Sequence, residues 1–411
     1  MCTTRWSGPR LVIDTDVGTD DALALILCIA AERRGDAEIL GVTCVHGNTD
    51  LPNVCVNTLK MLHTLRRLDS SYRPPEDRIV AIHCSREISA GPLLFNFNQD
   101  GQNISCGLTI SRSLPVYRGA SESIVRTFKR APEIHGSDGF GDFDYPDTPD
   151  VASHLQQEHA VNFLTRITRE NPGELTVLSL GPMTNIALAI RMDPNFCNNV
   201  KHIIIMGGNS EGIGNVTAGA EFNFYCDPEA AHICLHNMKC PITIFPWETA
   251  FNHCRLSYLA QRLKSEETNI VGTRNRTTRE IPEALKTSKT PLYDTTVLKE
   301  WRINILGGIK SPQAELMTKI ERPMLEQKRY GFWARCDPIA AAIAVNPQMA
   351  TVVSERYATV ELHGSATRGA LVIDHLNKMD REPNVTIVTR VDVELYKSML
   401  LEAFVFDFSK K

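Results

Sequence analysis

The sequence predicts an α/β fold in which a largely parallel central sheet is flanked by helices. Short apolar segments rich in Val, Ile and Leu alternate with longer helical segments nearly throughout the chain. Polar or glycine-rich turns follow several of these apolar segments. In open sheets of this kind ligands bind at the carboxyl ends of the strands. We therefore expect a single domain spanning residues 1–411, with a Rossmann-like sheet and an active site at that edge.

Composition limits the class of protein. Of the 411 residues 43% are hydrophobic and 22% charged, as in ordinary globular proteins. The net charge of −4 gives no electrostatic reason to expect a nucleic acid or an anionic membrane as partner. The longest apolar run, 22–31, is too short to span a bilayer. The first residues contain no apolar signal core, so we expect a cytoplasmic protein.

Four aspartates follow the first predicted strand. The apolar run Leu11-Val12-Ile13 leads into Asp-Thr-Asp-Val-Gly-Thr-Asp-Asp at 14–21, and an apolar helix follows. Carboxylates this close repel one another and raise each other's pKa. A hard cation would relieve the repulsion, and ligands that are all oxygen favour Ca²⁺ or Mg²⁺ over zinc.

Three other interpretations compete at this segment. Asp20 and Asp21 would favour a helix N-terminus through its dipole, with Thr19 as N-cap. An EF-hand loop would need a glutamate at its twelfth position, where this chain has Leu25. A haloacid-dehalogenase-type phosphatase also carries an Asp-x-Asp pattern after an apolar strand, and only the rest of the chain decides against it.

The remaining elements follow in order. A strand at 38–45 ends in His46-Gly47-Asn48, and a helix runs from about 50 to 65. Residues 66–114 have no sustained period and form an atypical insertion. The glycines of the loop at 135–142 are expected to let its backbone fold closely around another group. Further strands are expected at 175–180, 202–206, 241–247, 351–362, 370–374 and 385–391, and helices at 156–170, 183–191, across most of 256–330, at 339–345 and from about 393. Read locally, Asp337 is the N-cap of the helix that Pro338 opens.

Six polar segments follow one another along the chain. They are Asp14 to Asp21, His46-Gly47-Asn48, Gly181-Pro182-Met183-Thr184-Asn185-Ile186, Met206-Gly207-Gly208, Gly214-Asn215 with Ala220-Glu221-Phe222-Asn223, and Cys336-Asp337-Pro338. Taken together and in this order, they resemble the inosine–uridine-preferring nucleoside hydrolases, over about residues 10–60 and 115–400. Six segments in the right order make the resemblance specific and exclude the phosphatase interpretation.

The resemblance implies hydrolysis of the N-glycosidic bond of ribonucleosides by a homodimer or homotetramer. It implies a Ca²⁺ held by Asp16, Asp21, the Leu180 backbone carbonyl and Asp337. Asp20 is implied to be the general base that takes a proton from a calcium-bound water. The residues implied to hold the ribose are Asn48, Asn215, Glu221 and Asn223, with Met206 packed against the sugar and Asp14 orienting the site.

One position departs from the family pattern. Well-known members have His before the last calcium aspartate, where this chain has Cys336. A thiol, with an ordinary pKa of ~8.5, is a poorer acid for the leaving base than imidazole. His135, Tyr330 and Trp333 are candidates for contact with the base by their chemistry alone. The substitution and the insertion leave open an alternative, a catalytically silent homologue that binds a nucleoside or ribose.

Overall fold

A computed structural model of the chain describes residues 8–68, 113–127, 130–250, 299–326, 333 and 335–410. The predicted insertion at 66–114 therefore lies almost entirely outside the described residues, as does Tyr330. Most of the predicted helical region at 256–330 is outside them as well, because the description resumes only at residue 299.

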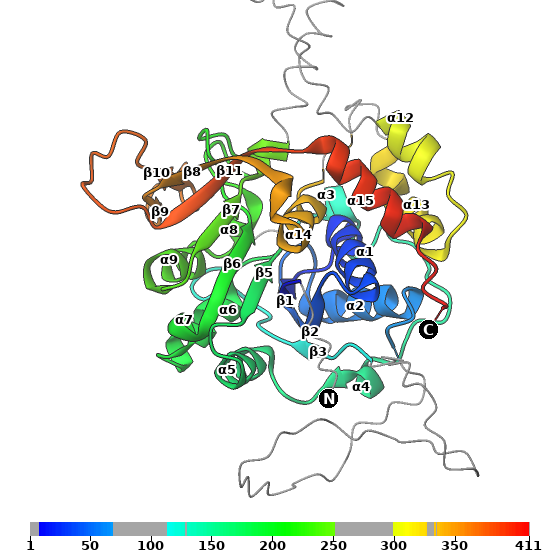
Figure 1. Ribbon diagram of the computed structural model, residues 1–411. Helices are drawn as coiled ribbons and strands as arrows, with labels where there is room; N and C mark the ends of the chain where they lie inside the picture. The colour runs from blue at the N-terminus through cyan, green and yellow to red at the C-terminus, as the bar shows by residue number, and fades with distance from the viewer. Residues whose placement is uncertain are drawn as a thin grey trace, which may run out of the picture.

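A nine-stranded sheet forms the centre of the described part of the chain (Figure 1). Its strands run in the order β4-β3-β2-β1-β5-β6-β7-β11-β8, and only the pair β11–β8 is antiparallel. The bounds are β1 (Arg10–Thr15), β2 (Glu38–Cys44), β3 (Val116–Arg118), β4 (Leu155–Gln156), β5 (Leu175–Ser179), β6 (Val200–Met206), β7 (Ile242–Phe245), β8 (Ala350–Arg356) and β11 (Val385–Val391). A separate antiparallel pair consists of β9 (Ala358–Val360) and β10 (Leu371–Ile373). The predicted α/β class with a mostly parallel sheet is confirmed.

Helices cover both faces of the sheet, as Figure 1 shows. One face carries α1 (Thr19–Arg34), α2 (Leu51–Thr64), α13 (Pro312–Leu325), α14 (Asp337–Val345) and α15 (Val393–Val405). The other carries α5 (Ala160–Glu170), α6 (Thr184–Met192), α7 (Phe196–Asn199) and α9 (Pro228–Asn237). The remaining helical segments are α3 (Pro132–His135), α4 (Val151–His154), α8 (Phe222–Cys226), α12 (Lys299–Trp301), the π-helical turn Arg302–Leu306 and the 3₁₀ turn Pro347–Met349. Among the described helices, none has both the length and the apolar character that crossing a bilayer would require.

The side chains of β1 explain its central place. Leu11 and Ile13 point into the core under α1 and α14, whereas Val12 points into the core under α5 and α6. All three are completely buried, as expected of a strand in a parallel sheet covered on both faces. The strand order reverses between β1 and β5, so the end of β1 lies at the switch point where ligands bind in such sheets.

Two predicted helix caps are wrong. Helix α1 begins at Thr19 with Gly18 as its N-cap, so Thr19 is the first helical residue. Helix α14 begins at Asp337 with Cys336 as its N-cap, so Asp337 is not the cap. The predicted helix at 156–170 starts only at Ala160, because Leu155 and Gln156 pair as strand β4. Asp20 and Asp21 in the first turn of α1, and Asp337 in the first turn of α14, are still favoured by the dipoles of these helices.

Candidate active site

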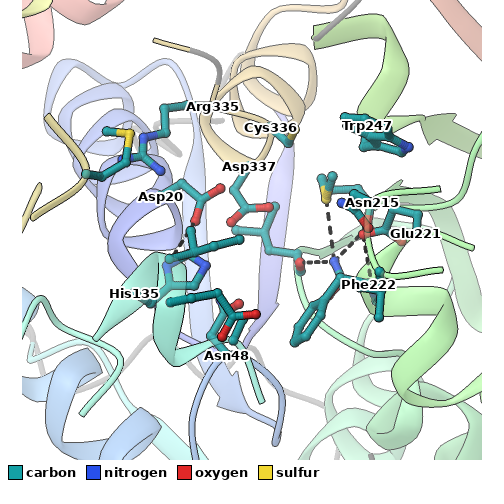
Figure 2. Close-up of a pocket in the computed structure, with 18 of the residues that line it drawn as sticks. Asp20, Asn48, His135, Asn215, Glu221, Phe222, Trp247, Arg335, Cys336 and Asp337 are labelled. Carbon is teal, nitrogen blue, oxygen red and sulfur yellow. Dashed lines mark hydrogen bonds and ion pairs between the residues drawn. The ribbon is translucent and has the colours of Figure 1, made fainter. Parts of the chain in front are cut away.

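Three carboxylates from opposite ends of the chain meet beside the end of β1. Asp20 and Asp21 lie in the first turn of α1, and Asp337 begins α14, which packs against α1. One carboxylate oxygen from each lies within 4.8 Å of the others. Figure 2 shows the side chains of Asp20 and Asp337 next to one another. The predicted proximity of Asp337 to the N-terminal aspartates is therefore present.

Asp16 is outside this group of three, but its charge interacts with those of Asp21 and Asp20, and one of its oxygens is unused. Its Oδ2 accepts a hydrogen bond from the Asn48 backbone N–H at 2.7 Å, while Oδ1 is buried without a hydrogen-bond partner among the described residues. A Cβ added at Gly47 would lie 1.9 Å from Asp16 Oδ2, and one at Gly181 would lie 2.7 Å from Oδ1. The two glycines therefore let backbone approach this carboxylate closely.

Asp21 and Asp14 are fixed by neighbouring polar groups. Asp21 accepts hydrogen bonds from the Thr15 hydroxyl at 2.5 Å, the Gly18 backbone at 2.9 Å and the Asn48 side chain at 3.0 Å. Asp14 Oδ1 accepts from Thr43 at 2.5 Å and from Asn185 at 2.8 Å, whereas its Oδ2 lacks a described partner.

Burial and mutual repulsion disfavour the charged forms of these groups. Burial raises the pKa of Asp14 to about 7 and that of Asp21 to about 6. Burial and then the charges of neighbouring aspartates hold the pKa of Asp16 and of Asp337 well above the usual range. A divalent cation would stabilise all the ionised forms, so the unsatisfied oxygen of Asp16 and the crowded carboxylates fit a bound metal ion.

Asp20 and Asp337 line a pocket of about 420 Å³, whereas Asp14, Asp16 and Asp21 are not among its lining residues. Glu221 lies on the opposite wall (Figure 2) and accepts hydrogen bonds from the backbone N–H groups of Gly208, Asn223 and Phe224. Burial raises the pKa of Glu221 to about 7. The Asn223 side chain donates to the Leu180 carbonyl at 2.7 Å and to the Met206 carbonyl at 3.1 Å. A carbonyl oxygen has two lone pairs, so the Leu180 carbonyl keeps one for a cation.

The other predicted sugar-binding residues also line this pocket, in different settings. Asn48 and Met206 are buried, whereas Asn215 is exposed. The predicted sugar-binding set is therefore brought to one cavity, whereas Asp14 does not line it and accepts a hydrogen bond from Asn185.

Among the described candidates for contact with the leaving base, two line the pocket and one does not. His135 and Cys336 line the pocket. The His135 Nδ1 accepts from the Thr19 backbone N–H at 3.1 Å, which places the ring proton on Nε2, and burial lowers the pKa of His135 to about 4. Trp333 is buried to 2% exposure and donates to Glu321, and it does not line the pocket.

Several pocket residues have no counterpart among the predicted ones. Phe222, Trp247, Met324 and Arg335 all line the cavity. Trp247 follows β7, so the rule that sites form at carboxyl ends of strands was a usable signal. Phe222 and Arg335 each stand next to a predicted site residue, but nothing local in the sequence indicates that their side chains face the cavity.

Fold and site together define an α/β protein with an acidic pocket that could bind a metal ion at the switch point of its sheet. The family described as inosine-uridine preferring nucleoside hydrolase matches residues 11–75 and 97–398. The chain belongs to this family, whose metal dependence agrees with the aspartate cluster.

Individual relatives agree with that assignment. The chain is 33% identical over 225 residues to uridine nucleosidase 1 of Arabidopsis thaliana, covering 54% of this chain and 52% of the relative. It is 26% identical over 399 residues to the pyrimidine-specific ribonucleoside hydrolase RihA of Salmonella schwarzengrund, covering 96% and 98%. The matched region thus spans about half the length of some curated relatives and nearly all of others. Among solved structures, an inosine-guanosine nucleoside hydrolase superposes with a TM-score of 0.70 at 25% identity, covering 97% of this chain and 99% of that one.

Proposed function

We propose that this protein hydrolyses the N-glycosidic bond of ribonucleosides, releasing a free nucleobase and ribose, with Ca²⁺ as its metal. The observation that carries the proposal is the meeting of Asp20, Asp21 and Asp337 beside a pocket that Asp20 and Asp337 line, together with Glu221 and Asn223. Carboxylates on one side and hydroxyl-binding groups on the other suit a sugar that becomes cationic as its base departs.

The residues proposed to hold the ion are Asp16, Asp21, Asp337 and the Leu180 carbonyl. All offer oxygen, and Asp16 Oδ1 has no described hydrogen-bond partner. Oxygen-only ligands of flexible geometry favour Ca²⁺, which does not demand a strict octahedron as Mg²⁺ does. When bound, the ion supplies a lowered pKa for the attacking water and a fixed orientation for the ribose diol.

Asp20 is the proposed general base. Its side chain is 17% exposed and lines the pocket, so the water that attacks the substrate can reach it. It takes one proton from that water as the water oxygen bonds to C1′ of the ribose. The C1′–N bond breaks at the same time, and the ionised aspartates stabilise the positive charge that develops on the sugar.

Recognition of the ribose is assigned to Asn48, Asn215, Glu221 and Asn223, with Met206 packed against the sugar. Glu221 and Asn223 are held by the backbone hydrogen bonds described above, so their orientation is set before a substrate arrives. A nucleoside lacking one ribose hydroxyl would leave buried polar groups unpaired, so 2′-deoxynucleosides should be poor substrates. We further expect a homodimer or homotetramer, which light scattering of the purified protein would test.

The direct test is incubation of the protein and Ca²⁺ with uridine, cytidine, inosine and adenosine, followed by assay of free base and reducing sugar. We expect equal amounts of base and ribose from at least one substrate. Thermal stabilisation by nucleosides without any product would instead identify a silent binding protein, and no release from any ribonucleoside would end the proposal.

A further inference from the structure

Glu248 is an enclosed carboxylate that follows the end of β7 and is 1% exposed. Its Oε2 accepts hydrogen bonds from the Ser210 backbone N–H, from the Ser210 hydroxyl at 3.0 Å and from the Glu211 backbone N–H at 2.8 Å. Its Oε1 accepts from the Ile213 backbone N–H at 2.8 Å. All four donors thus belong to one short segment, residues 210–213.

The carboxylate and this segment stabilise one another. Backbone N–H groups can only donate hydrogen bonds, and an ionised carboxylate can only accept them, so the two are matched. Hydrogen bonds to an ionised acceptor are also stronger than neutral ones. Moving the segment away would leave the enclosed carboxylate of Glu248 without partners, which is costly. Glu248 therefore fixes the path of segment 210–213.

Trp247 adds two contacts to the same part of the chain. Its indole N–H donates to the Ile213 carbonyl at 2.7 Å, and its backbone N–H donates to the Gly208 carbonyl at 3.3 Å. Apolar packing contributes little, because residues 211–212 are exposed and Ile213 is only half-buried. Figure 2 shows Trp247 and Asn215 on the same side of the pocket. Polar contacts with the residues that follow β7 therefore guide the chain toward Asn215.

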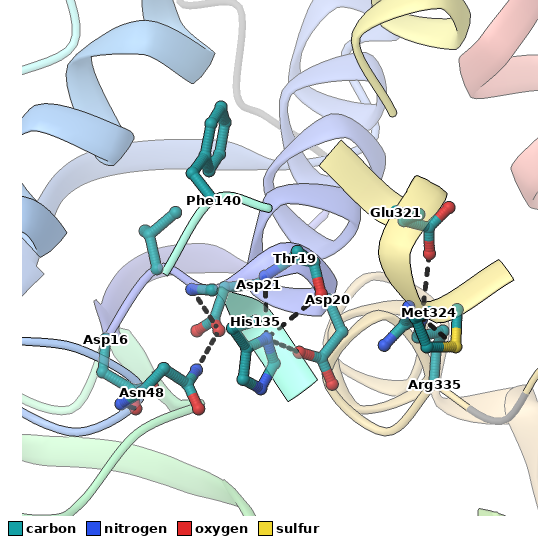
Figure 3. Close-up of polar contacts among 12 residues, drawn as sticks. Asp16, Thr19, Asp20, Asp21, Asn48, His135, Phe140, Glu321, Met324 and Arg335 are labelled. Atoms are coloured by element: carbon teal, nitrogen blue, oxygen red, sulfur yellow. Dashed lines mark hydrogen bonds and ion pairs between the residues drawn. The ribbon is translucent and has the colours of Figure 1, made fainter. Parts of the chain in front are cut away.

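Asn215 differs from the other predicted ribose-binding residues in how its side chain is held. The Asn48 side chain donates to Asp21 (Figure 3), and the Asn223 side chain donates to two backbone carbonyls. Glu221 accepts three backbone N–H groups. The Asn215 side chain makes no hydrogen bond to any residue in the part of the chain that the structure describes. Its position therefore depends on the backbone that carries it.

The backbone of Asn215 is supported from both directions along the chain. On the C-terminal side, its own N–H donates to the Ala220 carbonyl at 3.1 Å. On the N-terminal side, Gly214 alone separates it from Ile213, whose N–H is bonded to Glu248. A change at Glu248 would remove the second support and leave the first in place.

We propose that Glu248 is a positioning residue for ribose recognition, which holds the Asn215 amide where it can bind a ribose hydroxyl. This inference rests on the proposed function. Glu248 does not line the pocket, so it acts on the sugar through the backbone that leads to Asn215. An amide on a sugar hydroxyl contributes equally before and during bond cleavage. Its displacement should therefore raise KM and leave kcat unchanged.

The test combines Glu248→Gln with Asn215→Ala. Glu248→Gln keeps the size of the side chain but turns one acceptor oxygen into an NH₂ that faces a donor. It should raise KM for the ribonucleoside that the wild type cleaves best by roughly 3- to 10-fold, the worth of one neutral hydrogen bond. The double variant should have the KM of Asn215→Ala alone, because Glu248 acts through Asn215. Calcium affinity by calorimetry should equal that of the wild type.

Asp227→Asn is the matched control. Asp227 is 0% exposed and accepts from the Thr184 hydroxyl at 2.7 Å and from the Ile124 and Ala230 backbone N–H groups at 3.0 Å. Its bonding is therefore like that of Glu248, but it caps α9 and does not line the pocket. The control should lower the melting temperature, as Glu248→Gln does, and leave KM unchanged.

An unchanged KM in Glu248→Gln would overturn the proposal, as would an equal rise of KM in Asp227→Asn. So would a double variant whose KM rises by the product of the two single effects. If Glu248→Gln does not fold, Glu248→Asp keeps the charge but shortens the side chain, and the same rise and the same non-additivity with Asn215→Ala are required of it. A wild-type protein that releases no base would end the proposed function; the Kd for ribose, measured by calorimetry on the same variants, would then test Glu248 separately.

Discussion

Replacing Asp337 by Asn should have opposite effects on the metal-free and the calcium-bound protein. The substitution keeps the shape of the side chain and removes one negative charge from the group in which three carboxylate oxygens lie within 4.8 Å. Without metal this relieves repulsion, and with metal it removes a ligand. A residue whose only role is to begin a helix would change the stability of the metal-free and the calcium-bound protein in the same direction.

The size of the first effect follows from the spacing. Two unit charges 4.8 Å apart repel by about 3.5 kcal/mol at an effective dielectric constant of ~20, and by about 0.9 kcal/mol in bulk water. Burial already keeps part of the cluster protonated, so we expect a gain of about 1–3 kcal/mol in the free energy of unfolding. For 411 residues the unfolding entropy near the midpoint is about 0.9 kcal/mol/K, so the melting temperature should rise by about 1–3 °C.

The assay is a thermal melt of both proteins in chelator and in millimolar Ca²⁺. Wild type at a hundredfold excess over its Kd should gain about 2.7 kcal/mol from calcium, and Asp337→Asn should gain almost none. Asp227→Asn is the matched control, because Asp227 is equally buried but caps α9 away from the cluster. It should lower the melting temperature equally in both buffers. A variant at Asp337 that melts lower in chelator, or keeps the full calcium shift, would refute the reasoning.

Three further predictions concern the same site. Asp20→Asn should retain nucleoside binding by calorimetry while kcat falls roughly 10²–10⁴-fold, and a kcat within error of wild type would remove Asp20 as the general base. Because the pKa values of Asp14 and Asp21 are raised to about 7 and about 6, the metal-free protein should lose stability as pH rises from about 4 to about 7. Calcium should bind more tightly over the same interval and release protons as it binds. Calorimetry in buffers of different ionisation enthalpy measures the released protons, and their absence at pH 6 would count against the raised pKa values. Gly47→Ala should weaken calcium binding and lower stability, because its Cβ would stand 1.9 Å from Asp16 Oδ2; an unaltered calcium titration would show that the close approach is dispensable.

Sequence patterns predicted the fold and the acidic end of the site for physical reasons. The strand Leu11-Val12-Ile13 is buried on both faces, and its apolar run stops where the aspartates begin. Four charges after a buried strand require compensation whatever the surrounding fold. The position of this loop at the switch point then follows from the alternation of strands and helices.

The rest of the site depends on contacts that a sequence does not display. Asp337 has the local pattern of a helix N-terminus, and only its packing against α1 brings it to Asp21. Trp333 and Arg335 are two residues apart, yet the first is enclosed against Glu321 and the second faces the cavity. Which of such neighbours points inward is decided by tertiary packing rather than by local chemistry.

The central claim is that a calcium ion among Asp16, Asp21 and Asp337 enables this pocket to cleave ribonucleosides. The most direct measurement is a titration of chelator-treated protein with Ca²⁺, in which release of ribose from inosine or uridine is followed as bound calcium increases. We predict no turnover without metal and full turnover at one calcium ion per chain. Undiminished turnover in the presence of chelator would contradict the claim.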